Sequence, residues 1–124
     1  ADGVQIGSLF AACRESSAHQ QFKNLVIETK EGDTLLSLKK LVPVRLLKNE
    51  FQKIVFDKES EGASSEELRH LLGKGRSKKG IFEGDLVEGE LEIGQVAAQI
   101  NELVTADEII KRLITEFNQT IHNF

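Results

Sequence analysis

Residues 2–10 read DGVQIGSLF, and the interpretation of the whole sequence starts from this stretch. Val4-Gln5-Ile6 is rich in β-prone residues, which predicts a short strand that ends at Gly7-Ser8. A strand of this length is not stable alone, and no hairpin partner follows it closely. Because an unpaired strand leaves its main-chain hydrogen-bonding groups unsatisfied, we expect its partners to come from other residues or from another chain.

Gly7 and Ser8 form a candidate anion-binding turn at the end of this strand. Glycine lets the main chain approach an anion closely, and the serine hydroxyl adds one donor. In a (β/α)8 barrel, the phosphate of a cofactor often lies on the loops that follow strands seven and eight. The pentapeptide VQIGS taken alone favours the simpler interpretation, an ordinary glycine between a strand and a loop.

The composition is that of one domain with solvated charged faces. The 124 residues carry 29% charged side chains and a net charge of −4, with both signs interspersed, which argues against nucleic acid as a partner. No apolar run is long enough to span a membrane, and no secretory signal is recognisable. Cys13 is the only cysteine, which excludes an internal disulfide and favours a cytoplasmic location. Because methionine is absent even at the start, we expect that the chain was processed, cut or built as a fragment.

Capping residues followed by apolar residues at helical spacing predict most of the elements. Ser17, Ser64 and Thr105 are each followed by Gln or Glu three residues later, so each is expected to begin a helix. Pro43 suits the first turn of a further helix, which would place Arg45 on its solvated face. Residues 34–38 are expected to be extended after a turn at residues 31–33, and residues 73–94 to hold a short helix before Phe82 and then a loop.

The remaining polar clusters do not match known site patterns. The stretch GKGRSKKG at residues 73–80 fits neither a dinucleotide fingerprint nor a P-loop, and the acidic residues that follow do not match a calcium loop. His19, His70 and His122 are far apart and lack metal-ligand spacing, so we predict no metal site. His19 could face a ligand, but such a residue more often packs or caps locally. The residues leave the catalytic group unknown.

Three segments taken in order resemble one family. They are ADGVQIGSLFAACRESSAHQQFK (1–23), DTLLSLKKLVPVRLLKN (33–49) and GELEIGQVAAQI (89–100). Together they resemble the nitronate monooxygenase family, which includes the flavin-dependent enoyl-acyl carrier protein reductases of type II. The ordered set is specific, although each segment alone is weak.

The resemblance implies an α/β fold: the C-terminal part of an FMN-binding TIM (β/α)8 barrel with an added, mostly helical small domain, the 124 residues themselves being mainly α. Residues 1–32 would hold the last barrel strand, the phosphate loop and the following helix. Residues 33–93 would form the small helical domain or lid. Residues 94–124 would return to the barrel and end in a closing helix.

The resemblance also implies the binding residues. Gly7 and Ser8 would hold the FMN phosphate through main-chain N–H groups and the hydroxyl, with Gln5 as a supporting neighbour. Gly94 and Gln95 match the segment that returns to the cofactor side of the barrel. Ala98 stands where the family has a glycine. The family's catalytic histidine and most of its barrel correspond to positions before residue 1, so no catalytic residue is assigned.

The implied activity is that of an FMN oxidoreductase that passes electrons either from NAD(P)H to an enoyl thioester or from a nitronate to oxygen. The stretch VPVRLLKN favours an enoyl-acyl carrier protein reductase of fatty acid synthesis, with an acyl thioester as substrate and acyl carrier protein as partner. The alternatives are a monooxygenase that oxidises alkyl nitronates with oxygen, and a non-enzymatic helical interaction module. The expected further partners are the remainder of the barrel and a second copy of the chain. The 124 residues alone are expected to show no turnover and to bind FMN weakly or not at all.

Overall fold

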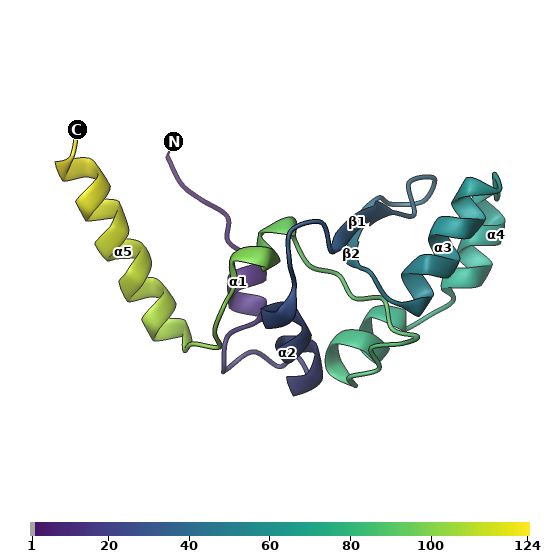
Figure 1. The fold of residues 1–124 in the computed structure, drawn as a ribbon, viewed down its shortest axis with the longest axis horizontal. Coiled ribbons are helices and arrows are strands. Elements are labelled where there is room, and N and C mark those ends of the chain that lie inside the picture. Colours follow the sequence, from purple (N-terminus) through teal and green to yellow (C-terminus); the bar gives the residue numbers. More distant parts are fainter. Residues whose placement is uncertain (1) are drawn as a thin grey trace.

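The structure is a computed structural model that describes residues 2–124; Ala1, which begins the first predicted segment, lies outside the described residues. The molecule is elongated, with α5 (Ala106–His122) at one end and α3 (Glu50–Ser60) packed beside α4 (Ser65–Leu72) at the other (Figure 1). Between them lie α1 (Ser8–Ala11), α2 (Gln20–Glu28), β1 (Thr34–Ser37), β2 (Val44–Leu47), the π-helical turn η1 (Lys78–Phe82) and the 3₁₀ helix η2 (Gln95–Gln99).

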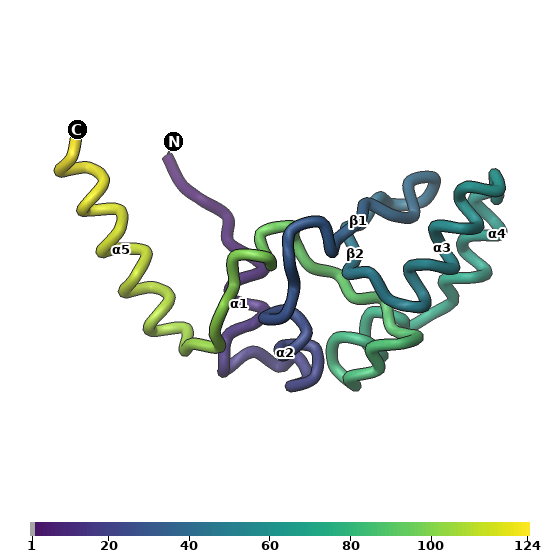
Figure 2. The backbone as a smooth tube through the Cα atoms, in the orientation of Figure 1, coloured from purple at the N-terminus to yellow at the C-terminus, as the bar shows by residue number. Residues whose placement is uncertain are grey.

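The strand predicted over residues 4–6 is not formed within the described part of the chain. Residues 2–7 have no regular secondary structure and lead away from α1, as the tube in Figure 2 shows. Val4 is 83% exposed, and the one sheet among residues 2–124 consists of β1 and β2. A strand exists only where a neighbour accepts and donates its main-chain hydrogen bonds, and these residues have no such neighbour here.

The first long helix begins two residues later than the capping pattern predicts. His19, not Ser17, is the N-cap of α2, because its Nδ1 accepts a hydrogen bond of 3.1 Å from the main-chain N–H of Gln21. The ring also packs against Gly84, where an added Cβ would lie 2.5 Å from Nδ1. His19 therefore caps the helix and packs locally, which is what the sequence analysis expected more often for such a residue than contact with a ligand.

The helix predicted from Pro43 is wrong, because residues 44–47 form β2. This strand pairs antiparallel with β1, with Thr34 opposite Leu47 and Ser37 opposite Val44. The predicted extended segment is confirmed over residues 34–37, although Leu38 has a positive φ of 55°, and it supplies the pairing that turns residues 44–47 into a strand. The helix starts instead at α3, where the side chain of Asn49 accepts a hydrogen bond of 2.8 Å from the N–H of Gln52.

The other two helix predictions are confirmed. Ser64 and Glu67 form a reciprocal capping box at the start of α4, and Gly73 ends the helix with a positive φ of 63°. Thr105 and Glu108 form the same arrangement at the start of α5. Both patterns depend only on residues within one helical turn, so they do not depend on the rest of the fold.

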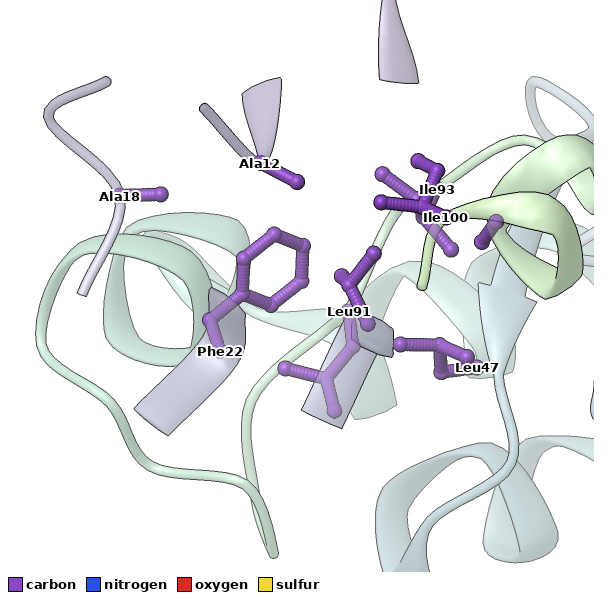
Figure 3. Packing of buried hydrophobic residues seen from close by; sticks show 9 residues of the cluster. Ala12, Ala18, Phe22, Leu47, Leu91, Ile93 and Ile100 are labelled. Atoms are coloured by element: carbon purple, nitrogen blue, oxygen red, sulfur yellow. The ribbon is translucent and has the colours of Figure 1, made fainter. Parts of the chain in front are cut away.

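The main hydrophobic core joins residues from all three predicted segments. Phe22 is 1% exposed and lies in one cluster with side chains from β2 and from the stretch that leads into η2 (Figure 3). This cluster holds α2 against residues 91–100. Its buried members are Ala12, Ala18, Phe22, Val26, Leu47, Leu91, Ile93, Ala97 and Ile100.

Two smaller clusters complete the packing. Leu46, Phe51, Val55 and neighbours bury the hairpin against α3 and α4. A third cluster around Ile109, against which Ala106 and Leu113 also pack, holds the start of α5. The other large apolar side chains of α5 are open to solvent. These side chains, each about half exposed or more, are Ile110, Ile114, Phe117 and Ile121. An uncovered apolar helix face of this length is typical of a surface that packs on another body.

A shared hydroxyl links two carboxylates next to the main core. Ser77 Oγ lies 2.9 Å from Glu90 Oε2 and 2.7 Å from Glu92 Oε1. One hydroxyl hydrogen cannot serve both acceptors at the same time, so the two carboxylates compete for Ser77. Glu90 is 6% exposed, and its burial, together with the charge of Glu92, raises the pKa of its carboxyl.

We expect Glu90→Gln to stabilise the protein more at neutral pH than at acid pH. The folded pKa of Glu90 lies above the unfolded value, so its contribution to stability is present at low pH and is lost as the pH rises through the folded pKa. Glutamine stays neutral, and its side-chain oxygen can accept the hydrogen bond from Ser77. The gain in unfolding free energy should therefore grow by on the order of 1 kcal/mol between about pH 4 and pH 7, measured by urea denaturation. An equal gain at both pH values would contradict the shift.

Candidate functional site

One long-range hydrogen bond joins two of the motif segments identified in the sequence. The main-chain N–H of Gly94 donates to Ser8 Oγ over 2.9 Å, across 86 residues of chain. A Cβ added at Gly94 would lie 2.8 Å from Ser8 Oγ, so glycine is needed at this position for the close approach. Ser8 thus accepts from Gly94, and its own hydroxyl hydrogen has no acceptor among residues 2–124.

Three of the five predicted site residues share one open hollow. Gly7, Ser8 and Gly94 line a hollow of about 430 Å³ on the surface between α1 and β2. Gly7 meets nothing within 4 Å at the position of an added Cβ, so the space beside it is free. The other lining residues are Ala11, Val44, Arg45, Glu92 and Ile93.

The two predicted glutamines lie outside this hollow. Gln5 is exposed on the irregular stretch before α1 and contributes nothing to the lining. Gln95 lines a neighbouring hollow of about 730 Å³ together with Ala98, the residue that replaces the family's glycine. The complete lining of this second hollow is Glu31, Gly32, Thr34, Arg45, Gln95, Val96, Ala98 and Gln99.

Arg45 lines both hollows, and the sequence interpretation missed it. A helix from Pro43 would have pointed this side chain into solvent, whereas β2 carries it half-buried between the two hollows. The β-prone residues at 34–38, which need an antiparallel partner, could have indicated the strand at residues 44–47. Arg45 belongs to the stretch VPVRLLKN, which the sequence interpretation uses only to favour a subtype.

The stretch from Glu15 to Lys23, which belongs to the first motif segment, supports the loop between α1 and α2 and the start of α5. Glu15 Oε2 accepts a hydrogen bond of 2.9 Å from the N–H of Ala106 and so anchors the start of α5. Lys23 is 4% exposed, and its Nζ donates to the carbonyl oxygens of Arg14 (3.1 Å) and Ser16 (2.7 Å). These contacts fix the loop between α1 and α2, so the motif residues here act on structure.

The other sequence candidates stay apart from the hollows. His70 and His122 are exposed on their helices, and Cys13 is buried in the small cluster beneath α5. Within residues 2–124, no group of three or more His, Cys, Asp or Glu side chains is arranged to hold a metal ion. In the same range, no helix combines the length and apolar character that a membrane crossing requires.

The residues of the first hollow fit a phosphate group. Ser8 offers a hydroxyl hydrogen, and the N–H groups in the first turn of α1 have no acceptor within their own helix. Gly7 leaves room for close approach, and Arg45 brings a positive charge to the same lining. Main-chain N–H groups, a hydroxyl and a guanidinium are the donors that bind phosphate oxygens in proteins.

Comparison with known proteins identifies the family. The family model described as nitronate monooxygenase matches residues 1–116, so the chain belongs to the nitronate monooxygenase family. A probable nitronate monooxygenase of Bacillus subtilis (strain 168) is 28% identical over 121 residues, covering 94% of this chain and 33% of the relative.

Solved structures agree with this assignment. FabK from Thermotoga maritima superposes with a TM-score of 0.88 at 30% sequence identity, covering 99% of this chain and 39% of that protein. The M276A mutant of the same FabK gives a TM-score of 0.81 at 26% identity, covering 99% of this chain and 36% of that protein. The chain therefore spans between about a third and two fifths of the length of these relatives.

Proposed function

We propose that this chain provides the flavin-phosphate site of an FMN-dependent oxidoreductase. The observation that carries the proposal is the hydrogen bond from Gly94 to Ser8, which unites two motif segments and leaves the hydroxyl hydrogen of Ser8 free. Membership of the nitronate monooxygenase family supports the same conclusion. Gly7 and Ser8 would hold the phosphate, with Gly94 positioning Ser8 and with Gln5 and Gln95 as outer neighbours.

The residues of this chain bind and orient in the proposed reaction. FMN, when bound, supplies the redox chemistry, accepting and passing on electrons. The hydroxyl of Ser8 donates to a phosphate oxygen, and the N–H of Gly94 keeps that hydroxyl pointed toward the hollow. The core around Phe22 keeps the stretch that carries Gly94 fixed against α2. The group that performs proton transfer is expected outside the 124 residues.

The open face of α5 supports packing on further protein. Ile110, Ile114 and Phe117 are between 49% and 64% exposed, and the relatives are about three times as long as this chain. We propose that the remainder of a barrel covers this face and pairs with residues 4–6 as a strand. The division into residues 1–32, 33–93 and 94–124 stays a proposal within that arrangement. The alternative occupant is a second copy of the chain.

We propose the reductase subtype ahead of the monooxygenase. The stretch VPVRLLKN and the likeness to FabK from T. maritima favour it, whereas the B. subtilis relative favours the oxidation of nitronates. The full-length protein separates the two by NAD(P)H oxidation driven by a crotonyl thioester against oxygen uptake with an alkyl nitronate. Acyl carrier protein is proposed as a partner only if a crotonyl thioester drives NAD(P)H oxidation. FMN bound without either activity would refute both subtypes.

The third candidate is a helical interaction module without catalysis. This candidate predicts that the helices of the chain bury their apolar faces against one another in one self-contained hydrophobic core. The open face of α5 does not favour this reading, because four large apolar side chains there remain uncovered by residues 2–124. Absence of flavin binding by the full-length protein would favour the interaction module over the oxidoreductase.

We expect Ser8→Ala to weaken FMN binding about tenfold or more in the full-length protein. The substitution removes a donor to the phosphate and also the acceptor of the Gly94 N–H, and one such hydrogen bond contributes about 1 kcal/mol or somewhat more. The dissociation constant is measured by quenching of flavin fluorescence.

Ser16→Ala is the matched control for this variant. Ser16 Oγ also accepts a main-chain hydrogen bond, 3.2 Å long from Ala18, but Ser16 does not line the hollow. It should cost similar stability while leaving the FMN dissociation constant within about twofold. Equal weakening by both variants would mean that Ser8 acts only through the fold.

A further inference from the structure

We propose that Arg45 is the cationic residue of this site and binds the phosphate held at Gly7 and Ser8. The assignment rests on the proposed function, and it adds a residue from the β-hairpin to a site otherwise built from the α1 turn and the stretch before η2. The observation behind it is that Arg45 belongs to the lining that also contains Gly7, Ser8 and Gly94.

The main chain fixes Arg45 beside the Ser8–Gly94 contact. Arg45 lies opposite Leu36 in the hairpin, and its carbonyl oxygen accepts a hydrogen bond of 3.3 Å from the N–H of Ile93. The next N–H along, that of Gly94, donates to Ser8 Oγ. Figure 1 shows β2 running beside the stretch that leads to η2. Three segments that are far apart in sequence therefore meet at this point.

The guanidinium is positioned but not neutralised. Its Nη1 donates to the carbonyl oxygen of Thr34 at 3.4 Å and lies 3.3 Å from Thr34 Oγ1. Among residues 2–124, no carboxylate lies within 4 Å of it, and Nε and Nη2 have no hydrogen-bond acceptor. A half-buried arginine with two unused donor nitrogens has a strong tendency to take an oxyanion.

The balance of charge in the hollow favours an anion at Arg45. Arg45 is the only cation in the lining, and Glu92 is the only carboxylate. Glu92 Oε1 already accepts a hydrogen bond from Ser77 at 2.7 Å. A phosphate ester brings up to two negative charges. The guanidinium of Arg45 would add one positive charge and two further donor nitrogens to the lining.

The test compares FMN with riboflavin, which lacks the phosphate, as ligands of the full-length protein. Arg45→Gln should weaken FMN binding about 10- to 100-fold, the loss expected for a charge-assisted hydrogen bond, and leave the riboflavin dissociation constant within about twofold. The salt dependence of FMN binding should also flatten, because one ionic contact is gone. Arg45→Lys, which keeps the charge, should recover part of the FMN affinity.

Lys48→Gln is the matched control, because it removes the same charge just beyond β2 from an exposed residue outside both hollows. It should leave FMN and riboflavin binding unchanged. Equal weakening of both flavins by Arg45→Gln would overturn the proposal and indicate a structural role. An unchanged FMN affinity with a raised KM for NAD(P)H would overturn it in favour of a second-substrate site at Thr34 and Gln95. If the unchanged protein binds neither flavin, the proposed function itself fails.

Discussion

Gly89→Ala is expected to lower the unfolding free energy by about 3 kcal/mol, which is at the upper end for overpacking. An added Cβ at Gly89 would lie 2.2 Å from Gly80 Cα and 2.4 Å from the carbonyl oxygen of Asp85. Both obstacles are main chain, so no rotamer change relieves the clash. The η1 turn and the loop after it would have to separate.

Gly89 is also part of the attachment of this loop to α3, so the effect on stability should be large. Asn49 Nδ2 donates to the carbonyl oxygens of Leu86 (2.9 Å) and Gly89 (2.8 Å), while Asn49 Oδ1 caps α3. A shift of Gly89 therefore disturbs the start of α3 as well. Urea denaturation followed by circular dichroism gives the unfolding free energy.

Two companion variants make this result interpretable. Gly80→Ala should cost less, because its closest obstacle is the end of the Leu91 side chain, at 2.6 Å, with Gly89 Cα farther away at 3.0 Å. Gly3→Ala places a Cβ in open space and should change stability by less than about 0.5 kcal/mol. A cost for Gly89→Ala no greater than for Gly3→Ala would mean that the loop does not pack as described.

The sequence predicted those elements whose cause is local. Ser64 with Glu67, and Thr105 with Glu108, satisfy each other within one turn, so the pattern was enough to place α4 and α5. Pro43 misled the interpretation because β2 depends on β1, and strand pairing is not local. His19 replaced Ser17 as the cap because its ring is also held against Gly84, a contact 65 residues away in the sequence that no local pattern contains.

The candidate site was predictable only in part from the sequence. The resemblance brought Gly7, Ser8 and Gly94 together as members of one family pattern, and the structure places them in one hollow. Their physical link, the acceptor role of Ser8 toward Gly94, was not readable from either segment alone. The sequence did not predict Arg45 as a site residue, because its position depends on the register of the hairpin, in which Leu36 lies opposite it.

Phe22→Ala is expected to lower the unfolding free energy by about 3–5 kcal/mol. Phe22 is 1% exposed at the centre of the largest cluster, where Figure 3 shows its ring beside Ala12 and Leu91. Removing the ring leaves a cavity between α2 and the stretch that carries Gly94. A domain stabilised by about 5–15 kcal/mol in total loses a large share of that to one substitution.

Phe56→Ala separates the loss of packing from the loss of an aromatic ring. Phe56 lies on α3 and is 53% exposed, so its truncation should cost less than about 1 kcal/mol. Phe22→Leu should fall between the two, because leucine refills part of the cavity. Since the Phe22 cluster also holds Ile93 and Ala97 on either side of Gly94, Phe22→Ala should weaken FMN binding in the full-length protein, while Phe56→Ala should not. Similar unfolding free energies for the two alanine variants would show that residues 91–100 are not anchored through Phe22.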